Sequence, residues 1–279
     1  MAMDSWSVTL VFVFVTLDSL LHHFLVFSKQ ENLKCSSSFL RAGHSYCDVV
    51  FSGRSSNEVS KMAVLSTNPL IKLYKNCITS QQQVSLMKLA KERLVEDTNS
   101  GFSWSLYLRD KRDANLEILR EIAMLAGNLS GLPWKLAEPV SLTKYTANQN
   151  YDLHYDSGFV TQGKKMKRAA TFLLYLNSVA QGGETIFPRS INGSHVGHKP
   201  LQVEKPLLKE ICCDEKILKV VPEARSCLVF FNHLVNEQDH GELNPRSIHG
   251  SCPVINGEKW IAQVWLHHEP WGSNVTDFW

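Results

Sequence analysis

The sequence lacks any dense run of lysine or arginine and any strong imbalance of charge. Its 29 basic and 27 acidic residues leave a formal net charge of +2. A protein that binds nucleic acid needs a concentrated basic surface to neutralise phosphates, so the sequence predicts no nucleic-acid partner. The seven cysteines include no CxxC pair. This absence argues against a zinc ribbon and against a thioredoxin-like redox site.

The chain also lacks the composition of a disordered or fibrous protein. Apolar residues make up 44% of it and charged residues 20%, which is ordinary for a protein with a buried core. No internal repeat is visible. A length of 279 residues suits one large domain, or one domain with an appendage. The sequence carries no signal for the oligomeric state.

The N-terminal segment decides the predicted compartment. Residues 6–27 are mostly apolar and about as long as a bilayer-spanning helix. We predict that residues 1–27 are a signal-anchor or a signal peptide, so that the protein lies in the endoplasmic reticulum, membrane-anchored or lumenal. The alternative is a buried helix or strand. Lys29 and Lys34 follow the segment and Asp4 precedes it, which by the positive-inside rule would hold the rest of the chain in the cytosol.

Acceptor sequons begin at Asn128, Asn192 and Asn274. They fit a secretory lumen and predict a glycoprotein. Because such triplets are frequent by chance, they do not decide the compartment.

The rest of the chain divides unevenly. Residues 28–68 are rich in serine and lack sustained periodicity, so we predict a linker or stem before a domain at 69–279. Short apolar runs of strand length then follow one another in the C-terminal half, at residues 169–176, 217–221, 226–231 and 260–266.

Helical patterns precede these strands. A helix is predicted over 81–95, with Ser80 and Gln83 as its capping box, and a second over 114–127 with Asp113 as its cap. Helices followed by many short strands indicate an α+β fold, a sandwich or jelly roll braced by N-terminal helices.

Candidate metal ligands lie in the β-rich half. Side chains at i and i+2 of a strand point to the same face, so His154 and Asp156 could bind one metal ion together. A surface pair is the alternative. His249 could supply a third ligand from a distant strand. Two histidines and one carboxylate form the facial triad that leaves coordination positions open on Fe(II), and such a site needs a co-substrate.

A lysine near the third ligand could bind that co-substrate. Lys259 lies ten residues after His249, at the start of a strongly apolar run. An intervening turn would place the two strands side by side, and a fixed ammonium could then hold the far carboxylate of a dicarboxylic acid. A solvated turn lysine is the alternative.

Four ordered segments carry a resemblance to a known family. They are residues 145–156 (YTANQNYDLHYD), 168–177 (RAATFLLYLN), 182–188 (GGETIFP) and 247–265 (SIHGSCPVINGEKWIAQVW). With these segments, residues 69–279 resemble the prolyl 4-hydroxylase branch of the Fe(II)/2-oxoglutarate dioxygenases. The resemblance implies a double-stranded β-helix (jelly-roll) core. It also implies hydroxylation of peptidyl proline at C4, with O₂ consumed and succinate and CO₂ released.

The resemblance further implies roles for individual residues. His154, Asp156 and His249 would bind Fe(II), and Lys259 would pair with the C5 carboxylate of 2-oxoglutarate. The implied cofactors are Fe(II), the co-substrate 2-oxoglutarate and ascorbate, and the implied partner is a proline-containing protein or peptide. Other matching positions would hold the co-substrate (Tyr145 and Thr185) or line the space for the prolyl ring (Tyr151, Arg168 and Trp265). For Tyr151 and Trp265, ordinary core packing is the alternative.

The chain also departs from the family pattern. It looks closest to the animal transmembrane type, yet the EF-hand loops expected of that type are absent. Asn148 and Ser251 replace glycines, and Arg225 stands where a glycine-containing turn is usual. The alternative function is therefore an inactive jelly-roll relative that binds peptide or metal. A cupin-type enzyme that works without 2-oxoglutarate would leave Lys259 without a role.

The resemblance brings two cysteine-bearing strands together. It suggests that the strands of Cys227 and Cys252 are close, so a disulfide between these residues is expected in an oxidising lumen. Two buried thiols are the alternative.

Overall fold

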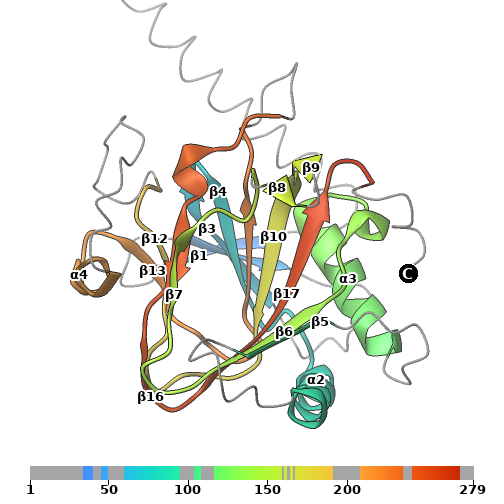
Figure 1. The fold of residues 1–279 in the computed structure, drawn as a ribbon, viewed down its shortest axis with the longest axis horizontal. Coiled ribbons are helices and arrows are strands. Elements are labelled where there is room, and N and C mark those ends of the chain that lie inside the picture. Colours follow the sequence, from blue (N-terminus) through green and yellow to red (C-terminus); the bar gives the residue numbers. More distant parts are fainter. Residues whose placement is uncertain are drawn as a thin grey trace, which may run out of the picture.

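The computed structural model describes residues 60–94, 116–158, 167–190, 208–234 and 241–270. It also describes the backbone of the strands at 34–39, 45–49, 104–107, 160–161 and 164–165. Two antiparallel sheets face each other in this part of the chain, with helices outside them (Figure 1). The predicted α+β fold with a jelly-roll core is confirmed.

The larger sheet has nine strands. In spatial order they are β1 (Lys34–Phe39), β2 (Ser45–Val49), β3 (Ser60–Thr67), β4 (Leu70–Lys75), β14 (Cys227–Phe231), β10 (Arg168–Tyr175), β17 (Lys259–His267), β6 (Ser141–Tyr145) and β5 (Trp104–Tyr107).

The smaller sheet has four strands, in the order β13 (Leu218–Val220), β12 (Thr185–Phe187), β15 (His249–Ser251) and β7 (Tyr151–His154). Two short ribbons accompany it, β11 (Gln181–Gly182) with β16 (Val254–Asn256) and β8 (Val160–Thr161) with β9 (Lys164–Lys165). The predicted strands at 169–176, 217–221, 226–231 and 260–266 are β10, β13, β14 and β17, and their bounds differ from the predicted ones by at most one residue.

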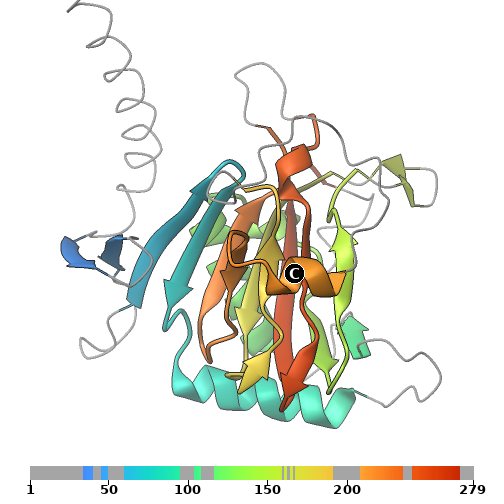
Figure 2. The same ribbon diagram turned by 90° about the vertical axis from the view of Figure 1, so that its left-hand side faces the viewer.

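The helices are α2 (Ser80–Arg93), α3 (Leu116–Ser130) and α4 (Leu208–Cys213), with 3-10 turns η1 (Trp134–Leu136) and η2 (Pro245–Ser247). α3 covers the outer face of the large sheet, and α4 lies beyond the small sheet on the opposite side (Figure 1). α2 crosses the lower end of the large sheet, which Figure 2 shows from the side.

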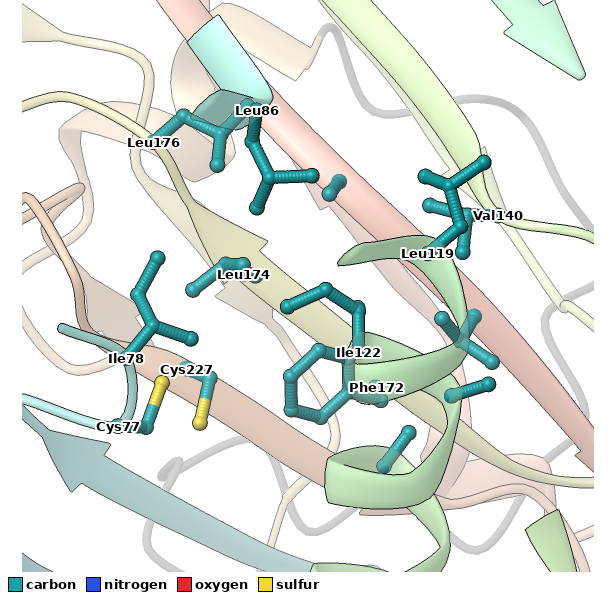
Figure 3. Close-up of a cluster of buried hydrophobic side chains, with 14 of the residues drawn as sticks. Cys77, Ile78, Leu86, Leu119, Ile122, Val140, Phe172, Leu174, Leu176 and Cys227 are labelled. Carbon is teal, nitrogen blue, oxygen red and sulfur yellow. The ribbon is translucent and has the colours of Figure 1, made fainter. Parts of the chain in front are cut away.

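The interior strand β10 is buried on both faces, which explains its continuous apolar sequence. Phe172 and Leu174 join the core beneath α2 and α3, drawn in Figure 3. Leu173 and Tyr175, at the alternate positions, join a second core between the two sheets. The face of the large sheet that carries Leu173 and Tyr175 therefore packs against the small sheet.

The capping box of α2 lies one residue before the predicted one. Thr79 Oγ1 accepts a hydrogen bond from the Gln82 amide at 3.1 Å, and the Thr79 amide donates to Gln82 Oε1 at 2.9 Å. Gln83 instead donates to the Leu176 carbonyl. Ser80 and Gln83 fit the same pattern, so the spacing alone could not separate the two registers. Asp113, the predicted cap of the next helix, lies outside the described residues.

The predicted linker at 28–68 contains three strands of the large sheet, β1, β2 and β3. Ser60–Thr67 is strand β3, which pairs with β4 and buries Met62, Ala63 and Leu65. Its serines suggested a loop, but the Ser60 hydroxyl is buried and donates to the Asn76 carbonyl at 2.8 Å. The predicted boundary at residue 69 therefore falls within the turn between β3 and β4.

The predicted disulfide between Cys227 and Cys252 is also wrong. Cys252 pairs with Cys212 of α4, with the two Cα atoms 5.8 Å apart. Strand alternation explains this choice, because Cys227 points into the core beneath the helices, beside Cys77 in Figure 3. Cys252 lies instead in a small cluster between α4 and the outer face of the small sheet.

The predicted signal segment at 1–27 lies outside the described residues. Within the part of the chain that the structure describes, no helix is long and apolar enough to cross a membrane.

Candidate active site

The three candidate metal ligands meet where two strands of the small sheet lie side by side. His154 ends β7 and His249 begins β15, and the two residues are register partners. Asp156 follows β7 in a bend rather than within the strand, so the turn of the chain brings its carboxylate to the histidines. Asp156 Oδ1 lies 3.4 Å from His154 Nε2, and Oδ2 lies 3.5 Å from His249 Nε2. One ligand atom from each residue lies within 4.8 Å of the others, so the group could hold a metal ion.

Backbone carbonyls orient both imidazoles. His154 Nδ1 lies 2.7 Å from the Asp152 carbonyl oxygen, and His249 Nδ1 lies 2.9 Å from that of Ser247. Because a carbonyl only accepts, each Nδ1 carries the hydrogen and each Nε2 presents a lone pair to the centre of the group. The two rings are therefore held in the tautomer that binds a metal.

Two residues that the sequence did not single out fix the carboxylate. Thr171 Oγ1 donates to Asp156 Oδ2 at 2.6 Å, and Asn232 Nδ2 donates to Thr171 Oγ1 at 3.1 Å. All three side chains are buried. This chain of hydrogen bonds runs from the large sheet to the metal-site carboxylate and sets its orientation.

The protonation states suit metal binding at neutral pH. Burial alone would raise the pKa of Asp156, but His249 and His154 together with the Thr171 hydroxyl hold it well below its usual range. Burial lowers the pKa of His249 to about 4, against the opposing effect of Asp156. A carboxylate and a neutral imidazole are the forms that coordinate a metal.

Lys259 is a buried cation between the two sheets, only 1% exposed. Its Nζ donates to Ser251 Oγ at 2.7 Å and lies 5.2 Å from the ring centre of Tyr145 and 5.8 Å from that of Tyr175. Burial lowers its pKa to about 7, with Glu184 acting in the opposite direction. Among the described residues no carboxylate forms an ion pair with this ammonium. An anionic ligand could supply the missing charge.

The predicted co-substrate residues surround Lys259. Tyr145 is its register partner on β6, and Thr185 is the register partner of Ser251 on the small sheet. Tyr175 OH donates to Thr185 Oγ1 at 2.8 Å, with both side chains buried. The ammonium therefore lies beside Ser251 of the small sheet and beside the rings of Tyr145 and Tyr175 of the large sheet.

The predicted residues of the prolyl space lie in two places. Tyr151 is 46% exposed, and its ring centre lies 4.3 Å from that of His154. The guanidinium of Arg168 stacks 3.9 Å from the ring centre of Trp265. The structure thus brings Arg168 and Trp265 together, while Tyr151 stands beside the metal site.

A buried carboxylate that the sequence did not reveal holds Arg168. Glu138 accepts from Arg168 Nε at 2.6 Å and from Nη2 at 2.8 Å, and His267 Nε2 lies 2.8 Å from the same carboxylate. Burial would raise the pKa of Glu138, but His267 and Arg168 lower it below its ordinary value. Glu138 comes after η1, outside every motif, so no spacing could have found it.

Two departures from the family pattern fall at special backbone positions. Asn148 and Arg225 both have a φ of 66°. This left-handed region favours glycine, and asparagine tolerates it better than arginine does. The structure therefore accounts for the glycines of the family pattern at these turns.

Comparison with known proteins agrees with this site. The family model of the 2OG-Fe(II) oxygenase superfamily matches residues 140–267. Probable prolyl 4-hydroxylase 6 of Arabidopsis thaliana is 31% identical over 229 residues, which cover 77% of this chain and 74% of that protein. Prolyl 4-hydroxylase 2 of the same plant is 31% identical over 228 residues, which cover 78% and 73%. The chain belongs to the prolyl 4-hydroxylase family.

Among solved structures, one match is the viral collagen prolyl hydroxylase of Paramecium Bursaria Chlorella virus-1 in its 2OG complex. The match has a TM-score of 0.48 and 20% identity, and covers 70% of this chain and 93% of that one. The predicted family and enzyme class, a 2-oxoglutarate-dependent dioxygenase, are confirmed by the curated relatives and the family model. The likeness to the animal transmembrane type stays a prediction.

Proposed function

We propose that this prolyl 4-hydroxylase family member hydroxylates peptidyl proline at C4, consuming O₂ and 2-oxoglutarate and releasing succinate and CO₂. One observation carries the proposal: His154, Asp156 and His249 converge on one point, near a buried lysine that lacks a carboxylate partner among the described residues. A cupin-type enzyme without 2-oxoglutarate gives no reason for that lysine.

The donor set fits the proposed metal. Two imidazole nitrogens and one carboxylate are the ligands that Fe(II) takes in such oxygenases, with coordination positions left open. In this proposal His154, Asp156 and His249 hold the iron, which with 2-oxoglutarate supplies the oxidising power for C–H hydroxylation. Thr171 keeps the carboxylate of Asp156 aimed at the metal.

The co-substrate would lie between the two sheets. Lys259 pairs with its C5 carboxylate, and Tyr145 and Thr185 hold it through their hydroxyls. Burial supports this assignment, since an ammonium excluded from water attracts a carboxylate far more strongly than an exposed one does.

The peptide would approach from the exposed side of the metal site. Tyr151 lies at that side and would line the prolyl ring, together with Arg168 and Trp265. Glu138 fixes the guanidinium of Arg168 and so limits the positions that a bound peptide can take.

The test is mass spectrometry of a panel of proline peptides treated with the protein, Fe(II), ascorbate and 2-oxoglutarate. The expected product gains one oxygen atom on proline, and His249→Ala is the inactive control. Uncoupled decarboxylation of 2-oxoglutarate tests the alternative of an inactive relative without knowledge of the peptide. A wild-type protein that binds Fe(II) but neither decarboxylates 2-oxoglutarate nor modifies any peptide would overturn the proposal.

We also infer that the protein works in the endoplasmic reticulum as a glycoprotein, anchored or lumenal, with ascorbate keeping the iron as Fe(II). The disulfide between Cys212 and Cys252 supports an oxidising compartment, and Asn128 is exposed on α3. Glycosidase treatment should shift the gel mobility of the protein from cells. An unchanged mobility, together with digestion of the domain from the cytosolic side of sealed microsomes, would contradict this localisation.

A further inference from the structure

Ser251 occupies a position beside the co-substrate lysine that the family pattern gives to glycine. It ends β15, two residues after His249, so both side chains point to the inner face of the small sheet. Its register partner on β12 is Thr185. Ser251 is buried, as are Thr185 and Lys259.

The Ser251 hydroxyl is the hydrogen-bond acceptor for the buried ammonium. Lys259 Nζ donates to Ser251 Oγ at 2.7 Å. An ammonium has three donors, so two remain for a ligand. The hydroxyl hydrogen of Ser251 is only weakly engaged, because the Cys252 carbonyl oxygen lies 3.4 Å away. Ser251 can therefore accept from Lys259 and at the same time donate to a carboxylate bound there.

We infer that Ser251 is a positioning residue for 2-oxoglutarate, which turns the Lys259 ammonium toward the C5 carboxylate and adds a hydroxyl donor to that site. The inference rests on the proposed function, since it assigns a further residue to the same co-substrate site. A glycine at this position would offer neither group.

Removal of the hydroxyl should weaken co-substrate binding. Without Ser251 Oγ, one N–H of the buried ammonium loses its partner, and the lysine side chain gains freedom to turn away from the ligand. Burial already disfavours the charged form of Lys259, so loss of the acceptor disfavours it further. Both effects act on 2-oxoglutarate and leave the iron ligands in place.

The experiment measures the affinities for Fe(II) and for 2-oxoglutarate separately, without O₂, by calorimetry on the purified protein. Ser251→Ala and Ser251→Gly should bind 2-oxoglutarate about tenfold more weakly, which is ~1.4 kcal/mol and near the lower end for a hydrogen bond to a charged group. Iron affinity should stay unchanged. Ser251→Thr, which keeps the hydroxyl, should recover most of the lost affinity.

Ser60→Ala is the matched control. This serine is also buried on a strand and donates to a backbone carbonyl, but β3 is separated from β17 by three strands. The 2-oxoglutarate affinity of the Ser60→Ala variant should equal that of the wild type.

The inference fails if Ser251→Ala binds 2-oxoglutarate as the wild type does, or if Ser251→Thr binds no better than Ser251→Ala. It also fails if iron affinity falls in parallel, because His249 shares β15 and a parallel loss would mean a disturbed strand. Failure of the proposed function looks different: the wild type itself would not bind 2-oxoglutarate, or Lys259→Ala would bind it normally.

Discussion

Thr171 Oγ1 donates a hydrogen bond of 2.6 Å to Asp156 Oδ2. Thr171 belongs to β10 of the large sheet, whereas Asp156 follows β7 of the small sheet. The hydrogen bond therefore links an interior strand of the large sheet to the carboxylate of the candidate metal site.

The first prediction concerns this hydrogen bond. Thr171→Val keeps the side-chain shape and removes the hydroxyl, so Asp156 loses the group that fixes its carboxylate. Loss of such an outer partner weakens metal binding by about 10- to 100-fold. Fe(II) titration of the purified variant, without O₂, measures the change. Thr171→Ser keeps the hydroxyl and should bind iron nearly as the wild type does; equal iron affinity in Thr171→Val would rule out this role.

The second prediction separates the co-substrate site from the metal site. Lys259→Ala removes one partner of a buried charged pair, which costs about 3–5 kcal/mol. This equals a loss of roughly two to three orders of magnitude or more in 2-oxoglutarate affinity. Iron affinity should not change, because Lys259 contacts no metal ligand.

Lys259→Arg keeps the charge but presents a larger planar group. Its 2-oxoglutarate affinity should fall between those of the wild type and Lys259→Ala. If Lys259→Ala bound 2-oxoglutarate normally, the proposed role of Lys259 in binding the co-substrate would be contradicted.

The third prediction is a proton taken up when 2-oxoglutarate binds. Burial lowers the pKa of Lys259 to about 7, while Glu184 opposes the shift and the facing side chains of Tyr145 and Tyr175 are uncharged phenols. At pH 8 most of the free protein therefore carries a neutral lysine, whereas the complex needs the ammonium. Binding should take up about one proton at pH 8 and almost none at pH 6, and the affinity should fall as pH rises above 7.

Calorimetry in buffers of different ionisation enthalpy, with the metal already bound, counts this proton. Lys259→Arg is the control, since a guanidinium stays charged throughout this range. Equal proton uptake by the wild type and Lys259→Arg at pH 8 would show that another group titrates.

The convergence of the three candidate metal ligands was predictable from the sequence because their residue types and spacing form a pattern. His154 and Asp156 stand two residues apart, and the segment around His249 carries an ordered motif. Four strands, β10, β13, β14 and β17, were predictable to within one residue because their apolar runs are bounded by turn residues. The local sequence pattern predicts the conformation and the burial of each segment by itself.

Contacts between distant segments cannot be predicted from such local patterns. Thr171 and Asn232 are ordinary residues for a strand and its end, and only the packing of two sheets brings them to Asp156. The cysteine pairing depends on which face of its strand each residue occupies, and Cys212 lies on a helix whose position no motif fixes. The serines of β3 resembled a linker because their buried hydrogen bonds are visible only in the fold.

The last prediction concerns Glu138, which holds Arg168 beside Trp265. Its carboxylate accepts two hydrogen bonds from the guanidinium and contacts His267, all in a buried setting. Glu138→Gln keeps the shape, but its amide group turns a donor toward the donors of Arg168 and removes the negative charge that Glu138 places beside that cation. The free energy of unfolding, measured with urea, should fall by about 3–5 kcal/mol.

Glu258→Gln is the matched control for this change. Glu258 also pairs with a cation, Lys144 at 2.8 Å, but its side chain is 47% exposed. An exposed ion pair contributes only about 0–1 kcal/mol, so this variant should unfold almost as the wild type does.

The functional readout adds a second criterion. If Glu138 positions Arg168 for the peptide, Glu138→Gln should raise the KM for a proline peptide. The measurement is made at a temperature at which the variant is folded. The affinities for iron and for 2-oxoglutarate should stay near those of the wild type. A variant with unchanged stability and unchanged peptide KM would mean that Arg168 keeps its place without the carboxylate. A loss of iron affinity as large as the loss of peptide binding would instead assign Glu138 to the support of Asp156, whose carbonyl oxygen lies 3.4 Å from Arg168 Nη1.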